Sequence, residues 1–273
     1  MSTDADLRGK TAVVTGASSG IGRAVAQRLG LVGALVYLIG RTAEPMQESR
    51  TIIERSGGKA EVVELDVRDS AAFATAIDRA ALESGRLDIV VNNAGLGYPG
   101  PILNGEREQW REMLDVNVLA VLVGAQAAVR AMRRAGNGGH IINISSTGAL
   151  RPDSGVYGST KYAVNYLTQG MRQELEDEDI RVSTVAPGVV ATNFVRHFDP
   201  QVVKSMTEML GLDLNLGPGD RWPDAALEQA QTTLENSVAQ PDDIADAVLY
   251  LVGLPLRLNI DDIIVRPAKQ LDF

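Results

Sequence analysis

The sequence predicts an α/β fold in which a parallel sheet of about seven strands carries helices on both faces. Short apolar runs alternate with longer amphipathic segments along most of the chain. Single helices separate successive strands, which is typical of parallel sheets because a parallel neighbour is reached only through a crossover segment. No internal repeat and no linker divides the 273 residues. We therefore expect one domain that covers residues 1–273.

The elements can be placed along the chain in order. The apolar runs are short and resemble strands that are buried on both faces, at residues 10–14, 34–39, 60–65, 87–92, 140–144, 180–185 and 262–265. The amphipathic segments between them indicate helices at residues 22–29, 44–55, 70–84, 106–133, 156–176 and 241–252.

Residues 193–239 interrupt this alternation, and we call them the excursion. A loop-like run from Gly211 to Gly219 lies in its middle, between two helix-like pieces. The excursion leaves from the carboxyl end of a strand, where ligands bind in open α/β sheets. Long insertions of this kind are often lids or binding loops. We expect a lid or substrate loop, and the alternative is a surface insertion without a role.

Composition and charge exclude several functions. A net charge of −9 opposes binding to nucleic acid and to anionic membranes, so neither partner is expected. The absence of cysteine excludes disulfides, thiolate metal sites and cysteine nucleophiles. The only histidines, His140 and His197, have no partners at metal-ligand spacing, so no metal is expected. Residues 1–10 are polar and no apolar stretch approaches a membrane span, which favours the cytoplasm.

A glycine-rich segment joins the first strand to the first helix. Thr15-Gly16-Ala17-Ser18-Ser19-Gly20-Ile21-Gly22 has the strand-turn-helix context of a phosphate-binding loop. Glycines let the backbone approach a ligand closely, and the helix N-terminus presents unpaired N–H groups to a pyrophosphate. The alternative is a tight turn that serves only helix packing.

Tyr157 and Lys161 are four residues apart in an expected helix, on the same face. A free tyrosine ionises near pH ~10, and a neighbouring lysine charge would favour the phenolate. Lowering the pKa of Tyr157 by about three units would take roughly 4 kcal/mol. Such a pair by itself is weak evidence of catalysis.

Six motifs together resemble the classical short-chain dehydrogenase/reductase family. They occur in the order and spacing of that family: 15–22, Asn92-Asn93-Ala94-Gly95, Asn117, the Ser145-Ser146 pair, Tyr157 with Lys161, and Pro187-Gly188 through Thr192. The resemblance implies an NAD(P)(H)-dependent oxidoreductase with a Rossmann-type, doubly wound fold. It also implies a homotetramer or homodimer.

The resemblance implies a coenzyme site along the carboxyl ends of the strands. The pyrophosphate would lie on the glycine loop, the adenine beside Asp66 and Val67, and the adenosine ribose along the segment after the fourth strand. The residues assigned to the coenzyme are Gly16, Ser18, Ser19, Gly20, Ile21, Gly22, Arg41, Asp66, Val67, Asn93, Ala94, Gly95, Tyr157, Lys161, Pro187, Gly188, Val190 and Thr192. The last four would hold the nicotinamide end.

The resemblance also implies the catalytic roles. Tyr157 would exchange a proton with the substrate oxygen, Lys161 would lower the pKa of Tyr157, and a serine would stabilise the oxyanion. Asn117 would anchor a water behind Lys161, although a buried asparagine at a helix kink is an alternative. Strand alignment favours Ser146 as the serine, whereas alignment on the following loop favours Ser145.

The end of the second strand bears on the choice between NAD and NADP. An acidic residue there binds the ribose hydroxyls of NAD, whereas an arginine pairs with the 2′-phosphate of NADP. This chain has Arg41 and no acid, so NADP(H) is favoured over NAD(H). The basic residue that many NADP-dependent relatives carry in the glycine loop is replaced by Ser19. Alternatively, Arg41 stacks on the adenine without selecting the phosphate.

The expected activity is hydride transfer between nicotinamide and a carbonyl compound or secondary alcohol. Residues 259–267 resemble a branch of the family that oxidises hydroxy acids and similar alcohols. A non-catalytic nucleotide-binding regulator is the alternative, but such a protein would be expected to have lost Tyr157, Lys161 or the serine. A sugar epimerase would use a different glycine spacing and a larger C-terminal domain.

Overall fold

The computed structural model describes residues 5–98, 100–198, 200–214, 216–217, 219–234 and 237–269. Its described strands form one seven-stranded sheet in the order β3-β2-β1-β4-β5-β6-β7, and every neighbouring pair is parallel. They are β1 Thr11–Thr15, β2 Leu35–Gly40, β3 Lys59–Glu64, β4 Ile89–Asn92, β5 Gly139–Ile144, β6 Ile180–Pro187 and β7 Asp262–Val265. The predicted Rossmann-type α/β fold is confirmed.

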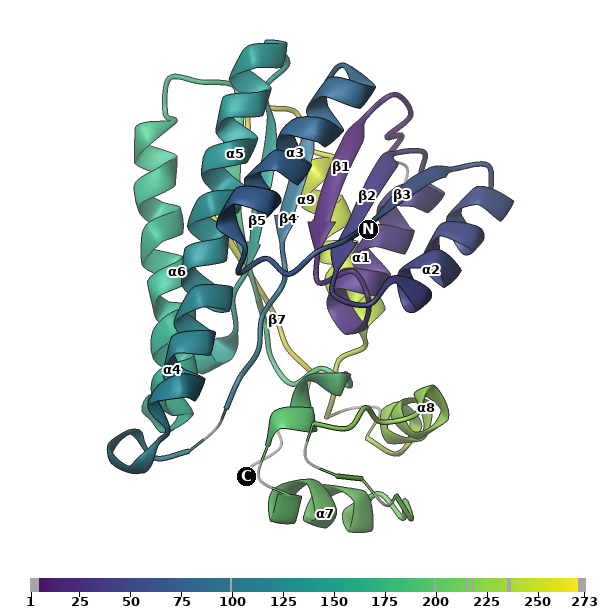
Figure 1. Ribbon diagram of the computed structural model, residues 1–273, viewed down its shortest axis with the longest axis vertical. Coiled ribbons are helices and arrows are strands. Elements are labelled where there is room, and N and C mark those ends of the chain that lie inside the picture. Colours follow the sequence, from purple (N-terminus) through teal and green to yellow (C-terminus); the bar gives the residue numbers. More distant parts are fainter. Residues whose placement is uncertain are drawn as a thin grey trace.

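Helices cover both faces of the sheet (Figure 1). In the described part of the chain they are α1 Gly20–Leu31, α2 Ala43–Arg55, α3 Ser70–Ser84, α4 Arg107–Leu114, α5 Ala120–Ala135, α6 Gly155–Glu174, α7 Pro200–Met209, α8 Asp224–Thr233 and α9 Pro241–Val252. α1, α2 and α9 pack in one apolar cluster, and α3, α5 and α6 pack in the other. The sheet therefore has two separate cores, one on each face.

Alternation along the strands fills both cores. In β1, Ala12 and Val14 face the cluster under α1, α2 and α9, while Val13 faces the opposite cluster. All three side chains are fully buried. Successive side chains of a strand point to opposite faces, so a strand covered on both sides must be apolar throughout. This explains why the strands are visible in the sequence as unbroken apolar runs.

Local signals place the ends of several helices. The Asp69 carboxylate accepts a hydrogen bond from Ala72 N (3.0 Å) at the start of α3, and Gly85 ends this helix with φ 76°. Gln240 and Asp243 form a capping box at the start of α9. The bounds of α3 and α9 agree with those expected from the sequence.

The helix expected over residues 106–133 differs from a regular α-helix. It consists of α4, a π-helical turn η2 (Asp115–Leu119) and α5. By length and apolar composition, the 29-residue run Arg107–Ala135 could cross a membrane, although the sequence pattern suggested no such stretch. Half of its most apolar window is buried in the protein, as in the core helix of a soluble protein.

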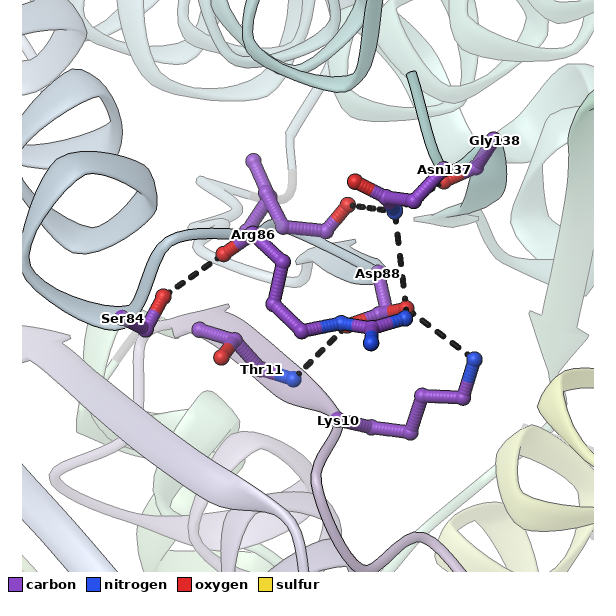
Figure 2. A network of polar contacts seen from close by, with 8 residues as sticks. Lys10, Thr11, Ser84, Arg86, Asp88, Asn137 and Gly138 are labelled. Atoms are coloured by element: carbon purple, nitrogen blue, oxygen red, sulfur yellow. Dashed lines mark hydrogen bonds and ion pairs between the residues drawn. The ribbon is translucent and has the colours of Figure 1, made fainter. Parts of the chain in front are cut away.

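A buried carboxylate joins the amino ends of β1 and β4 (Figure 2). Asp88 accepts hydrogen bonds from Arg86 (2.5 and 2.7 Å), Lys10 (3.1 Å) and the backbone N–H of Thr11 (2.9 Å). Burial by itself would raise the pKa of Asp88, but these donors outweigh it and the pKa is lowered. The carboxylate therefore connects β1 to the start of β4.

The excursion folds into short helices beside the carboxyl ends of the strands (Figure 1, lower part). Its elements are the 3₁₀ turn η5 (Asn193–His197), α7 and α8, and Val190 pairs with Ala239 in a parallel bridge where its two ends meet. A small apolar cluster includes Leu210, Trp222 and Ala226. Trp222 is buried in this cluster, so it packs within the excursion.

Candidate active site

The glycine loop makes a tight turn against the end of β4. Gly16 and Gly20 have φ angles of 67° and 53°, a region that L side chains rarely adopt. A Cβ on Gly22 would lie 2.4 Å from Gly16 O and 2.3 Å from Asn93 Nδ2, so only glycine fits there. Ser19 begins α1 without a side-chain cap on the helix N–H groups. This close turn and uncapped N-terminus fit the pyrophosphate of a dinucleotide.

The loop is held by the residues that follow β4. Thr15 Oγ1 accepts hydrogen bonds from the backbone N–H groups of Asn93 and Ala94, both at 2.9 Å. Asn93 Nδ2 donates to Thr15 O (2.8 Å). The strand order reverses between β1 and β4, which is where ligands bind in doubly wound sheets. The structure thus brings the glycine loop and the segment 93–95 together.

Tyr157 and Ser146 meet above the end of β5. The Ser146 hydroxyl lies beside the Tyr157 ring, since a Cβ on Gly148 would lie 3.2 Å from Ser146 Oγ and 3.3 Å from Tyr157 Cε1. Ser146 Oγ also accepts a hydrogen bond from Gly148 N (3.0 Å). Ser145 instead donates its hydroxyl to the backbone oxygen of Lys161 (3.2 Å) and is buried. Of the two serines considered from the sequence, Ser146 is the one beside the phenol.

Lys161 lies one turn after Tyr157 in α6 and is almost completely buried. Its ammonium donates to Ile144 O (2.9 Å), and burial lowers its pKa to about 8. A Cβ on Gly95 would lie 3.3 Å from Lys161 Nζ, so the ammonium lies close to the segment after β4.

The pKa of Tyr157 differs from the sequence-based expectation. Burial raises it to about 12, and the opposing influence is the hydrogen bond from Ser146 rather than the charge of Lys161. The charge of Lys161 is not among the causes that shift this pKa here, and its effect on the phenol beside a bound coenzyme stays a prediction. The ammonium is directed to the backbone of β5, and its own pKa is lowered by burial. Tyr157 is protonated at neutral pH, as a proton donor must be.

Asn117 connects the π-helical turn to two neighbouring segments. Its Nδ2 donates to Leu96 O (2.8 Å) and to Thr160 Oγ1 (3.0 Å), and its Oδ1 accepts from Leu96 N (3.0 Å). Thr160 in turn donates to Tyr157 O (2.7 Å). The Asn117 side chain thus bonds protein groups at a break in the helix, as in the alternative considered from the sequence. The water expected at Asn117 stays a prediction, since Oδ1 accepts only one of these bonds and an amide oxygen can accept two.

Comparisons with known proteins agree with this geometry. Residues 10–202 match the family model described as short chain dehydrogenase. The chain belongs to the short-chain dehydrogenase/reductase family. It is 33% identical to the dehydrogenase/reductase SDR family member 11 of Bos taurus, over 96% of this chain and 98% of the relative.

Two solved structures of short-chain dehydrogenases also match along most of their length. One, from Burkholderia cenocepacia J2315 in complex with NADP, is 32% identical with a TM-score of 0.76 and covers 96% of this chain and 98% of its own. Another, from Mycobacterium paratuberculosis bound to NAD, is 26% identical with a TM-score of 0.75, covering 96% and 97%. This short-chain dehydrogenase is therefore an NAD(P)-dependent oxidoreductase.

In this dehydrogenase the residues expected to hold the adenosine follow β2 and β3. Arg41 follows β2 and is exposed, and Val67 is buried. Asp66 bonds the Arg68 guanidinium (2.6 and 2.9 Å), and this bond lowers the pKa of Asp66, with a smaller contribution from the charge of Arg41. Arg41 and Asp66 thus lie near each other, and their contact with the coenzyme stays a prediction.

The segment after β6 extends from the sheet to the glycine loop. Gly188 N donates to Val265 O (2.7 Å), which continues the pairing with β7. A Cβ on Gly188 would lie 3.0 Å from Arg266 Cβ, so a larger residue would be crowded. Further along, the methyl group of Thr192 lies 3.0 Å from the place of a Cβ on Gly20. Residues 188–192 therefore run from the end of β7 to the glycine loop.

Sequence reasoning missed an aromatic contact in the catalytic centre. The rings of Tyr157 and Phe194 are 5.2 Å apart between centroids, and Phe198 packs edge-on against Phe194 at 6.1 Å. A Cβ on Gly97 would lie 2.7 Å from Phe194 Cζ. The beginning of the excursion thus lies on the catalytic tyrosine candidate. The only signal for this contact in the sequence was the position of Phe194, two residues after Thr192.

Proposed function

We propose that this dehydrogenase transfers hydride between NADP(H) and a carbonyl compound or secondary alcohol, with Tyr157 as the general acid/base. The observation that carries the proposal is the placement of Ser146 and Tyr157 side by side at Gly148, one helical turn before the buried ammonium of Lys161. Two hydroxyls that converge in this way can bind one substrate oxygen between them. The retention of all three groups argues against a non-catalytic regulator.

The protonation states favour a role in reduction. When bound, the coenzyme supplies hydride to the carbonyl carbon. Tyr157, with a pKa of about 12, would donate its proton to the carbonyl oxygen, while Ser146 would hydrogen-bond the same oxygen. Lys161, with a pKa of about 8, would be charged at neutral pH and would stabilise the phenolate that remains. Asn117 would hold α6 against the segment after β4.

The glycine loop, the segment 93–95 and residues 187–192 would hold the coenzyme. The uncapped start of α1 would take the pyrophosphate, and Arg41 would pair with a 2′-phosphate. One of the two matching structures contains NADP and the other contains NAD, so they do not favour either coenzyme. The proposed preference for NADP(H) therefore rests on Arg41. The excursion would act as the lid over the substrate.

We also propose a homotetramer or homodimer in the cytoplasm. Exposed apolar side chains on the outer helices support assembly, namely Leu114, Leu119, Leu122, Tyr162 and Tyr166. The acidic charge supports the absence of nucleic acid and membrane partners.

The proposed function is tested by following the oxidation of NADPH with a panel of ketones, aldehydes and keto acids, and the reverse reaction with the matching alcohols. Turnover of at least one member is expected. Tight coenzyme binding without turnover on any member of a broad panel would instead support the regulator.

Arg41→Asp should weaken NADPH binding by at least about tenfold and change NADH binding much less. The substitution removes a charge-assisted contact of ~1.5–3 kcal/mol and adds repulsion of the 2′-phosphate. Dissociation constants can be measured by the fluorescence of the reduced coenzymes. Arg55→Asp, at the exposed far end of α2, is the matched control and should leave both constants unchanged. Equal losses for NADPH and NADH would refute the phosphate assignment.

A further inference from the structure

The second half of the excursion packs on the glycine loop. Arg221 Nη2 donates to the backbone oxygen of Ser18 at 3.4 Å. Three residues later, Asp224 at the start of α8 approaches Arg23 of α1 at 3.6 Å. The exposed guanidinium of Arg221, which is 203 residues from Ser18 in the sequence, therefore lies on the loop expected to bind the coenzyme.

Ser18 also lies against the end of β2, directly before Arg41. A Cβ on Gly40 would lie 3.4 Å from both Cβ and Oγ of Ser18. Ser18 is therefore contacted by Arg221 from the excursion and lies close to Gly40, the residue directly before Arg41. In the part of the chain that the structure describes, neither arginine forms an ion pair with a carboxylate.

A third guanidinium lies near both arginines. Burial lowers the pKa of Arg196, and the charges of Arg221 and Arg41 each lower it further, so Arg196 is repelled by both. The nearby carboxylate of Asp66 is already bonded to Arg68. An anion with more than one negative charge would relieve this repulsion.

The glycine loop itself has a serine, Ser19, where a basic residue would assist NADP binding. We propose that Arg221 supplies this missing cation, so that the excursion and the end of β2 bind the adenosine 2′-phosphate between Arg221 and Arg41. A guanidinium presents paired N–H donors that match phosphate oxygens. The inference rests on the proposed NADP(H) function and adds that coenzyme selectivity depends on the docked excursion.

The test compares Arg221→Gln and Arg221→Lys with the wild type. Dissociation constants are measured for NADPH, for NADH, and for adenosine 2′,5′-bisphosphate, which carries the 2′-phosphate without the nicotinamide. Arg221→Gln should raise the dissociation constants of NADPH and of the bisphosphate about tenfold, and that of NADH by less than about twofold. Arg221→Lys should recover part of the loss, because it retains the charge but not the paired donors.

Arg257→Gln is the matched control. Arg257 is exposed, and its neighbour Leu256 contacts Gly138 just before β5, at the end of the sheet opposite the glycine loop. This variant should not change any of the three constants. If Arg221→Gln weakens the binding of NADPH and NADH equally, Arg221 acts on the shared pyrophosphate or in loop packing. If it weakens the binding of neither, Arg221 does not contact the coenzyme. Either outcome overturns the inference.

The two proposals fail in different ways. If the wild type binds NADH as well as NADPH and Arg41→Asp has no selective effect, the proposed coenzyme preference itself is wrong. If Arg41→Asp is selective for NADPH and Arg221→Gln is not, only the role of Arg221 is refuted.

Discussion

Tyr157→Phe should lower kcat for carbonyl reduction by about 10³-fold or more and leave coenzyme binding nearly unchanged. General acid catalysis typically contributes 10²–10⁴-fold, and phenylalanine removes only the donor oxygen. The ring contact with Phe194 is retained, so the shape of the centre should be preserved. The loss is measured as kcat on any substrate identified from the carbonyl panel, with the dissociation constant of NADPH measured in parallel.

Tyr166→Phe is the matched control for this experiment. Tyr166 lies in the same helix but is 71% exposed, so its hydroxyl should contribute nothing to kcat. Ser146→Ala should cost roughly 10²-fold, as expected for the loss of one oxyanion donor. Wild-type activity in Tyr157→Phe would remove the basis of the proposed mechanism. Loss of NADPH binding in that variant would assign Tyr157 to the coenzyme rather than to proton transfer.

Asp88→Ala should lower the free energy of unfolding by about 3 kcal/mol, because it removes a buried carboxylate that binds two cations and a backbone N–H. In the network of Figure 2, Lys10 and Asp88 are 78 residues apart in the sequence. Loss of the Asp88 carboxylate should therefore destabilise the whole sheet. The measurement is chemical unfolding at pH 7. Asp6→Ala, in an exposed pair with Arg8, is the control and should leave the unfolding midpoint unchanged.

The effect of Asp88→Ala should depend on pH in a defined direction. The pKa of Asp88 is lowered in the folded protein from an ordinary value of 3.8. A carboxylate with a depressed pKa stabilises the folded state fully above its unfolded pKa, and this contribution is lost as the pH falls through the folded value. The difference between wild type and variant should therefore be constant above about pH 5 and shrink below pH 3.8. An unchanged difference at acid pH would show that packing, not charge, accounts for the loss.

The sheet could be predicted from the sequence because its strands are buried on both faces. Val13 and its neighbours are apolar whichever face they cover, so each strand is visible as one run. The break in the helix at residues 115–119 could not be predicted in this way. It depends on the hydrogen bonds of Asn117 with Leu96 and Thr160, which come from segments 21 and 43 residues away. Local propensity contains no information about such partners.

The same distinction holds within the site. Gly16, Tyr157 and Lys161 were found because their chemistry depends on short spacings along the chain. The choice between Ser145 and Ser146 depended on the turn after β5, which directs only Ser146 to the phenol. The raised pKa of Tyr157 could not be predicted from the spacing to Lys161, because it is caused by burial, which depends on the whole surrounding fold.

By itself, the sequence determined the α/β fold, the loop suited to a phosphate and the residue types of a dehydrogenase centre, since all of these depend on periodicity and close neighbours. Only the tertiary structure decided how the excursion lies on the site, with Phe194 on Tyr157 and Arg221 on Ser18. These contacts join segments up to 203 residues apart. Their formation depends on packing energy summed over the folded chain, and no local pattern records that sum.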